Sequence, residues 1–117
     1  MKEVLEKIIF PETAFCTVWE FVQSHNHMDI HVTNFGEEKP FLLRFHGVEF
    51  YSGPLIWNAS SIDLGSEGDR NELMANSLWA YDGNLDNLYL FKIGAPELVV
   101  KIIARDLKVE EGLMGSA

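Results

Sequence analysis

The feature that most constrains this chain is a change of phase in its apolar residues around Gly47. Phe41 and Phe45 lie at odd positions before this glycine, whereas Val48 and Phe50 lie at even positions after it. Side chains of a β-strand alternate between the two faces of a sheet, so one extra residue is needed to keep both sets on one face. Glycine takes up the unusual dihedrals of such a bulge most easily. The segment therefore predicts a half-buried antiparallel strand with a β-bulge at Gly47.

The rest of the chain alternates between strand-forming segments and turn residues. Residues 13–23 fit both a helix face and a strand, and the turn-like residues 24–27 that follow favour the strand, paired in a hairpin with residues 28–33. Ser52, Gly53 and Pro54 predict a turn into a strand over residues 55–64, with Leu55 and Trp57 on one face and Ile56 and Ile62 on the other. Residues 88–93 and 97–109 predict a final hairpin, whose last strand buries its even-numbered residues.

Two segments have helical spacing and two have the composition of loops. Val4, Leu5 and Ile8 predict a short amphipathic helix over residues 2–9, which Pro11 would end. The acidic, glycine-containing residues 65–69 predict a loop, and residues 70–81 a helical turn leading into a short strand. We expect one domain over residues 1–117: an N-terminal helix and turn (1–12), then an α+β, mainly antiparallel β fold of about six to eight strands, a sandwich or partly open barrel, with a frayed tail over 110–117.

Composition limits the function classes that this chain can belong to. Eighteen acidic and nine basic residues leave a net charge of −9, which argues against nucleic acid and anionic membranes and favours a basic protein partner. No segment has the 18 or so apolar residues of a membrane span, and no secretory signal begins the chain, so we expect a cytoplasmic protein. The single cysteine, Cys16, lies in an apolar run and is expected to be a core residue.

Histidines form the one cluster with metal-ligand character. His25, His27, Asp29 and His31 would share one face of an extended strand, where they could bind a divalent transition metal. The pattern superficially resembles the metal motif of cupins, but His31 stands where that motif has a glutamate. A metal- or small-molecule-binding β-barrel that uses His25, His27 and His31 is therefore the alternative hypothesis, and a solvated hairpin without cofactor is the simpler one.

Catalytic signatures are weak in this chain. Its serines do not lie in a Gly-x-Ser-x-Gly elbow, and there is no phosphate-binding glycine loop. Arg44 could meet a substrate carboxylate, but pairing with Glu49 or Asp106 on a neighbouring strand is the simpler expectation. Whether the chain is an enzyme stays open, with a non-catalytic role favoured.

Two segments resemble small bacterial domains, some of which are assigned as immunity proteins of polymorphic toxin systems. These are LRFHGVEFYSGPLIW and VVKIIARDLKVEE, which carry structural glycine, aromatic and aliphatic residues and no catalytic ones. The resemblance implies a non-catalytic, acidic module that neutralises a basic toxin. Acidic loop residues would then contact the toxin, namely Glu37, Glu38, Glu67 and Asp69. A homodimer formed through an edge strand is a third hypothesis.

Overall fold

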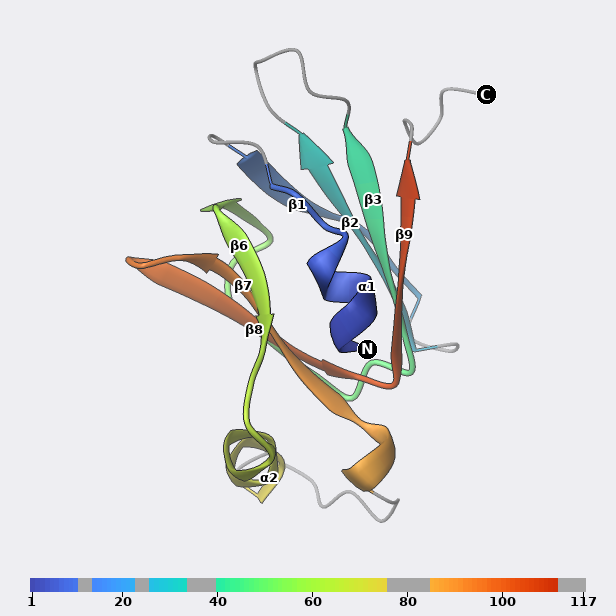
Figure 1. The fold of residues 1–117 in the computed structure, drawn as a ribbon, viewed down its shortest axis with the longest axis vertical. Coiled ribbons are helices and arrows are strands. Elements are labelled where there is room, and N and C mark those ends of the chain that lie inside the picture. Colours follow the sequence, from blue (N-terminus) through green and yellow to red (C-terminus); the bar gives the residue numbers. More distant parts are fainter. Residues whose placement is uncertain (11–13, 23–25, 34–39, 76–84, 112–117) are drawn as a thin grey trace.

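The computed structural model describes residues 1–10, 14–22, 26–33, 40–75 and 85–111 of the chain (Figure 1). Within these ranges it contains two α-helices, one short 3-10 helix (Leu85–Asn87) and nine strands. The α-helices and strands are, in chain order, α1 (Lys2–Glu6), β1 (Ala14–Val22), β2 (His27–Thr33), β3 (Phe41–His46), β4 (Phe50–Ser52), β5 (Ile56–Ala59), β6 (Ser61–Leu64), α2 (Glu67–Ala75), β7 (Tyr89–Ala95), β8 (Leu98–Ala104) and β9 (Asp106–Glu111).

The strands form two antiparallel sheets that face each other across the core. One sheet has five strands in the order β5-β1-β2-β3-β9, and the other has four in the order β4-β8-β7-β6. The predicted α+β, mainly antiparallel fold with a short N-terminal helix is therefore confirmed. The described part has more strands than the six to eight expected, because three predicted strands bend and continue in the other sheet.

The phase change at Gly47 marks the first of these bends. His46 of β3 pairs with Asp106 of β9, and Phe50 of β4 pairs with Ile103 of β8, so residues 47–49 lie opposite only 104 and 105. Gly47 has a φ of 65°, in the left-handed region that favours glycine. The extra residue is thus present as predicted. It forms a corner between the two sheets, as strands that change sheets often do, and not a bulge within one strand.

The same corner divides the long C-terminal strand. The backbone N–H of Arg105 donates to the carbonyl of His46 at 3.0 Å, between the end of β8 and the start of β9. Val100, Ile102 and Ala104 are buried as predicted, but the even-numbered Leu98 is 42% exposed, and the odd-numbered Ile103 and Leu107 are buried as well. The prediction of one uninterrupted alternation over residues 97–109 is therefore wrong. Strand β9 reaches Glu111, into the predicted tail, and residues 112–117 lie outside the described ranges.

A second corner divides the predicted strand over residues 55–64. Strand β5 pairs with β1, whereas β6 pairs with β7 of the other sheet, and between them the N–H of Ser60 donates to the carbonyl of Gly94 at 2.9 Å. Trp57 is buried while Leu55, which precedes β5, is 63% exposed. Their predicted common face is wrong, because Leu55 belongs to the turn and not to the strand.

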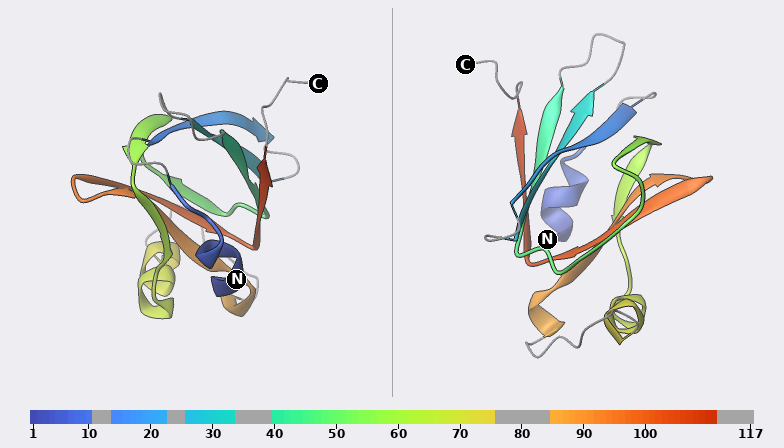
Figure 2. Two further views of the ribbon diagram at one scale, coloured as in Figure 1. Left: turned by 45° about the horizontal axis from the view of Figure 1, so that its top comes forward. Right: turned by 180° about the vertical axis from the view of Figure 1, so that it is seen from behind.

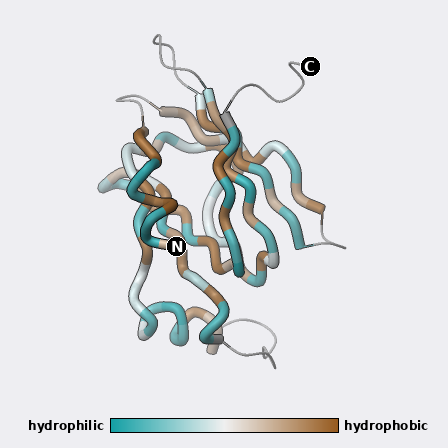
Figure 3. Tube along the Cα trace, turned by 45° about the vertical axis from the view of Figure 1, so that its right-hand side comes forward, coloured by the Kyte–Doolittle hydropathy of each residue, from teal (hydrophilic) through white to brown (hydrophobic). Residues whose placement is uncertain are grey.

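The predicted loop over residues 65–69 is also wrong, because helix α2 begins at Glu67. Ser66 precedes the helix, and its Oγ accepts a hydrogen bond from the N–H of Asp69 at 3.0 Å. A serine cap and the acidic side chains of Glu67 and Asp69 in the first turn stabilise a helix start. These effects offset the low helix propensity of Gly68. Figure 3 shows the largely hydrophilic α2 apart from the strands, along which hydrophobic and hydrophilic residues alternate.

The core lies between the sheets and is covered at one end by the N-terminal segment. Figure 2 shows α1 at the opening between the two sheets, where its apolar side chains Val4 and Leu5 pack on the core. The indole Nε1 of Trp57 donates to the carbonyl of Ile93 at 3.1 Å and so connects β5 of one sheet with β7 of the other.

Cys16 is completely buried, as expected for a core residue, and burial raises the pKa of its thiol to about 12. Across the described ranges, none of the helices has the length and apolarity required to cross a membrane.

Candidate functional site

The candidate site is the outer face of the five-stranded sheet, the face turned away from the core. Because neighbouring residues of β2 alternate, the buried Met28, Ile30 and Val32 leave His27, Asp29 and His31 on this outer face. The prediction that these three side chains share one face is consistent with this alternation. His25, the fourth member of the predicted cluster, lies outside the described residues.

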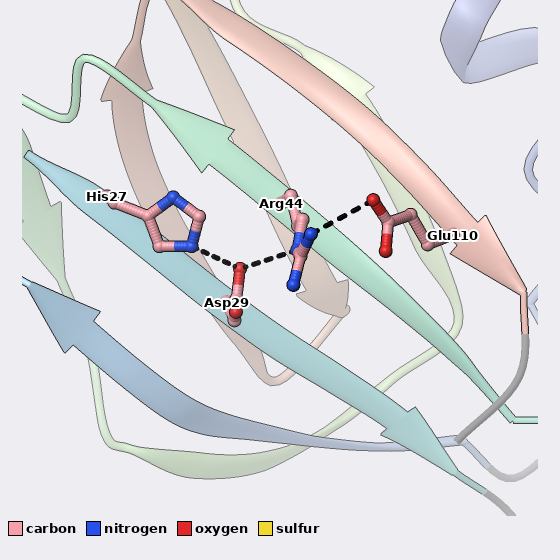
Figure 4. A network of polar contacts seen from close by, with 4 residues as sticks. All are labelled: His27, Asp29, Arg44 and Glu110. Atoms are coloured by element: carbon pink, nitrogen blue, oxygen red, sulfur yellow. Dashed lines mark hydrogen bonds and ion pairs between the residues drawn. The ribbon is translucent and has the colours of Figure 1, made fainter. Parts of the chain in front are cut away.

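A network of charged and polar side chains crosses three strands of the outer face (Figure 4). The Nε2 of His27 lies 2.7 Å from Oδ1 of Asp29 on the same strand. The same oxygen lies 3.4 Å from Nε of Arg44 on β3, and Nη1 of Arg44 donates to Oε1 of Glu110 on β9 at 3.0 Å. Arg44 therefore pairs with Asp29 and Glu110, and not with the expected Glu49 or Asp106. The network ties together β2, β3 and β9, with Asp29 and Arg44 directly opposite in the strand register.

Asp29 is the centre of this network and is only 2% exposed. An isolated carboxylate at such a position would be costly, so it requires nearby positive charge. Its Oδ1 makes close contacts with His27 and Arg44, yet neither contact has hydrogen-bond geometry, which leaves Oδ1 without a hydrogen bond within the described structure. Asp29 is therefore a buried carboxylate held between His27 and Arg44, just below the surface of the outer face.

Trp19 projects from the outer face beside this network. The register between β1 and β2 shifts between Val18 and Glu20, which leaves Trp19 without a register partner. Its indole is 60% exposed and meets the ring of His31 edge to face, with ring centres 5.8 Å apart. Burial lowers the pKa of His31 below its usual 6.5, so this ring is neutral at pH 7. The sequence leaves the position of Trp19 open, because tryptophans in a domain of this size could line a ligand pocket or a partner surface but more often fill the core.

Two further apolar side chains extend the exposed surface beyond Trp19. Ile56 of β5 is 64% exposed and lies opposite Thr17 of β1 in the register. The carbonyl of Leu55 accepts a hydrogen bond from the N–H of Val18 at 2.8 Å, which places this exposed residue next to the bulge. We call Trp19, Leu55 and Ile56 the apolar patch. Trp19 contacts His31, which lies two residues from Asp29 of the polar network along β2.

Two of the remaining predicted site residues, Glu67 and Asp69, are not brought to this face. Glu67 and Asp69 lie exposed on α2, which Figures 1 and 2 show beside the four-stranded sheet, and Asp69 is 3.7 Å from Nζ of Lys92. Glu37 and Glu38 lie outside the described residues. Among the residues that the structure describes, no three His, Cys, Asp or Glu side chains form a group that could hold a metal. With His25 outside those ranges, the three-histidine metal site stays a prediction.

Two hollows lie elsewhere on the described surface. A pocket of about 240 Å³ between α2 and β7 contains the buried Arg70, whose guanidinium already donates to the carbonyl of Leu88 and to Oδ1 of Asn71. A more open groove of about 600 Å³ lies between α1 and β9, and its charged rim carries two glutamates and two lysines. Neither hollow is lined by an exposed tryptophan, as the outer face is by Trp19.

No protein-family model, curated protein or solved structure matches this chain.

Proposed function

We propose that this chain is a non-catalytic protein-binding domain whose outer face binds a basic partner protein. The sharpest form of the proposal is an acidic, cytoplasmic immunity-like protein that neutralises a basic toxin, in keeping with the resemblance of its central and C-terminal segments. The observation that carries the proposal is the exposed Trp19, flanked by Leu55 and Ile56 and bordered by buried negative charge at Asp29.

A tryptophan side chain is rarely this exposed on a folded domain unless it takes part in binding. Trp19 has more than half of its surface open to solvent, and Leu55 and Ile56 are similarly exposed. Large apolar side chains that gather on one face mark interaction surfaces, and tryptophan is enriched among the residues that contribute most to binding. The polar network beside the patch supplies the charged border typical of such interfaces.

The overall charge favours a basic partner. A net charge of −9 attracts a basic protein from a distance and speeds its encounter with this chain. Glu67 and Asp69 on α2 contribute to this field although they lie away from the outer face. In this proposal α2 accelerates association, whereas the apolar patch slows dissociation.

The protein to test as partner is the product of the reading frame immediately upstream in the genome. Its association with immobilised chain should be measured by biolayer interferometry at two salt concentrations. We expect fast association that slows as salt rises, because screening weakens steering. Glu67→Lys with Asp69→Lys should slow association and reduce its salt dependence. Trp19→Ala should raise the dissociation rate about tenfold or more, in the range of interface residues that contribute most.

Ile9→Ala is the matched control for Trp19→Ala, because Ile9 is an exposed apolar residue of the N-terminal segment, outside the apolar patch. It should leave both rate constants unchanged. The proposal is wrong if the upstream product does not bind, or if it binds with rates that neither salt nor Trp19→Ala changes. Stoichiometric metal in untagged protein, lost on His27→Ala, would favour the metal-binding alternative. A concentration-independent dimer in light scattering would favour the homodimer.

A further inference from the structure

We infer that the bulge of β1 receives an arginine side chain of the partner, held between the indole of Trp19 and the carboxylate of Glu20. This inference rests on the function proposed above and names the chemistry that the outer face recognises.

The bulge makes these two residues neighbours on one face. Val18 lies opposite the buried Ile30, and Glu20 lies opposite Asp29 on the outer face, so Trp19 is the inserted residue. In a regular strand Trp19 and Glu20 would point to opposite faces. Here the ring contact between Trp19 and His31 places the indole on the outer face, and the register places Glu20 there too. Bulges commonly redirect side chains in this way near binding sites.

Among the described charged side chains around the bulge, Glu20 is the one that is available to pair with a cation. Arg44 is balanced by Asp29 and Glu110, with which it forms ion pairs. Glu20 is exposed and has no ion pair within the described part of the chain. Asp29, which lies opposite Glu20 in the register, is already paired with Arg44, so the exposed carboxylate of Glu20 is the one that remains for an incoming cation. A positive group from outside complements this arrangement.

Trp19 makes arginine the best fit among positive groups. A cation is attracted to the face of an indole, and a planar guanidinium can stack on the ring while it donates to a carboxylate beside it. The adjoining His31 is neutral at pH 7 and does not repel the incoming charge. Leu55 and Ile56 provide apolar surface for the methylene groups of an arginine or of its neighbours.

The probe for this inference is an acetylated, amidated tetra-arginine peptide, with the tetra-citrulline peptide as its uncharged counterpart of the same shape. Binding is followed by ¹H–¹⁵N NMR at low salt, with the indole signal of Trp19 assigned from Trp19→Phe. We expect saturable shifts of the Trp19 indole and the Glu20 amide with the arginine peptide alone. Glu20→Gln should weaken binding about two- to fivefold, which corresponds to the loss of one exposed ion-pair contact.

Glu72→Gln is the matched control, because it removes the same charge from an exposed glutamate of α2 to which no binding role is assigned. It should change the affinity less than Glu20→Gln does. Equal shifts with the citrulline peptide, or an equal effect of the two variants, would overturn the inference. If the upstream product binds and Glu20→Gln leaves its dissociation rate unchanged, this inference fails while the proposed function stands. If no upstream product binds, the proposed function fails whatever the peptides show.

Discussion

Replacement of Gly47 by alanine tests the corner that joins the two sheets. Gly47 has a φ of 65°, and a Cβ built on it would lie 2.8 Å from Cγ and Cδ of Arg105 and 3.0 Å from its Cβ. The substitution therefore forces a left-handed conformation on alanine and also requires the side chain of Arg105 to move. We expect the folded protein to be less stable, with its strand order unchanged.

The expected loss follows from two opposing terms. A left-handed conformation costs an L-residue about 1–2 kcal/mol relative to glycine. Alanine also restricts the unfolded chain, which returns about 0.4–1 kcal/mol. Displacement of Arg105 adds to the loss, because contacts of 2.8 Å involve atoms close to the backbone and not the free end of the side chain. We therefore expect a net loss of about 1–2 kcal/mol, or roughly 4–8 °C in Tm for a domain of this size.

Thermal and urea unfolding followed by circular dichroism will measure this loss. Gly68→Ala is the control, because Gly68 lies in α2 and a Cβ there would meet only Oγ of Ser66 at 3.9 Å. Alanine has the higher helix propensity, so this variant should be as stable as the original or more stable. Gly47→Asn should lose less than Gly47→Ala, since asparagine tolerates the left-handed region better. If Gly47→Ala unfolds at the same temperature as the original protein, the proposed role of this corner is refuted.

Three further predictions concern the core and the outer face. Trp57→Phe removes the hydrogen bond to the Ile93 carbonyl and should cost about 1–3 kcal/mol in urea unfolding, whereas Trp19→Phe should change stability by about 0.5 kcal/mol or less. Cys16, buried and with its pKa raised to about 12, should resist iodoacetamide at pH 8 until the protein unfolds, and rapid labelling of folded protein would contradict its core position. The pKa of His31 is lowered in the folded state, so the unfolded chain binds more protons as the pH falls below about 6.5, and stability decreases. His31→Gln should reduce this decrease between pH 7 and 5 in urea unfolding, and an unchanged pH profile would count against the burial of that ring.

The shared face of the polar residues on β2 could be predicted from the local sequence pattern, whereas the ion-pair partners of Arg44 could not. The alternation of His27, Asp29 and His31 predicts that they share a face, because strand geometry alone sets the period of two. Arg44 was expected to meet Glu49 or Asp106, but it meets Asp29 and Glu110. Its partners depend on which strands lie side by side and in which register. Those choices come from packing of the whole domain, over separations as long as the 66 residues between Arg44 and Glu110.

The sequence by itself determined most of the strand-forming segments and the phase change at Gly47, since period-two alternation and the backbone freedom of glycine are local properties. It also determined the negative charge and the absence of strong catalytic motifs. Only the tertiary structure decided that the extra residue at Gly47 turns the chain from one sheet into the other, because Arg105 on the opposite strand bends at the same corner. It likewise decided that Trp57 is buried and Trp19 exposed. The same side chain lies in the core or on the surface according to the strand that pairs with it, and no local pattern contains that information.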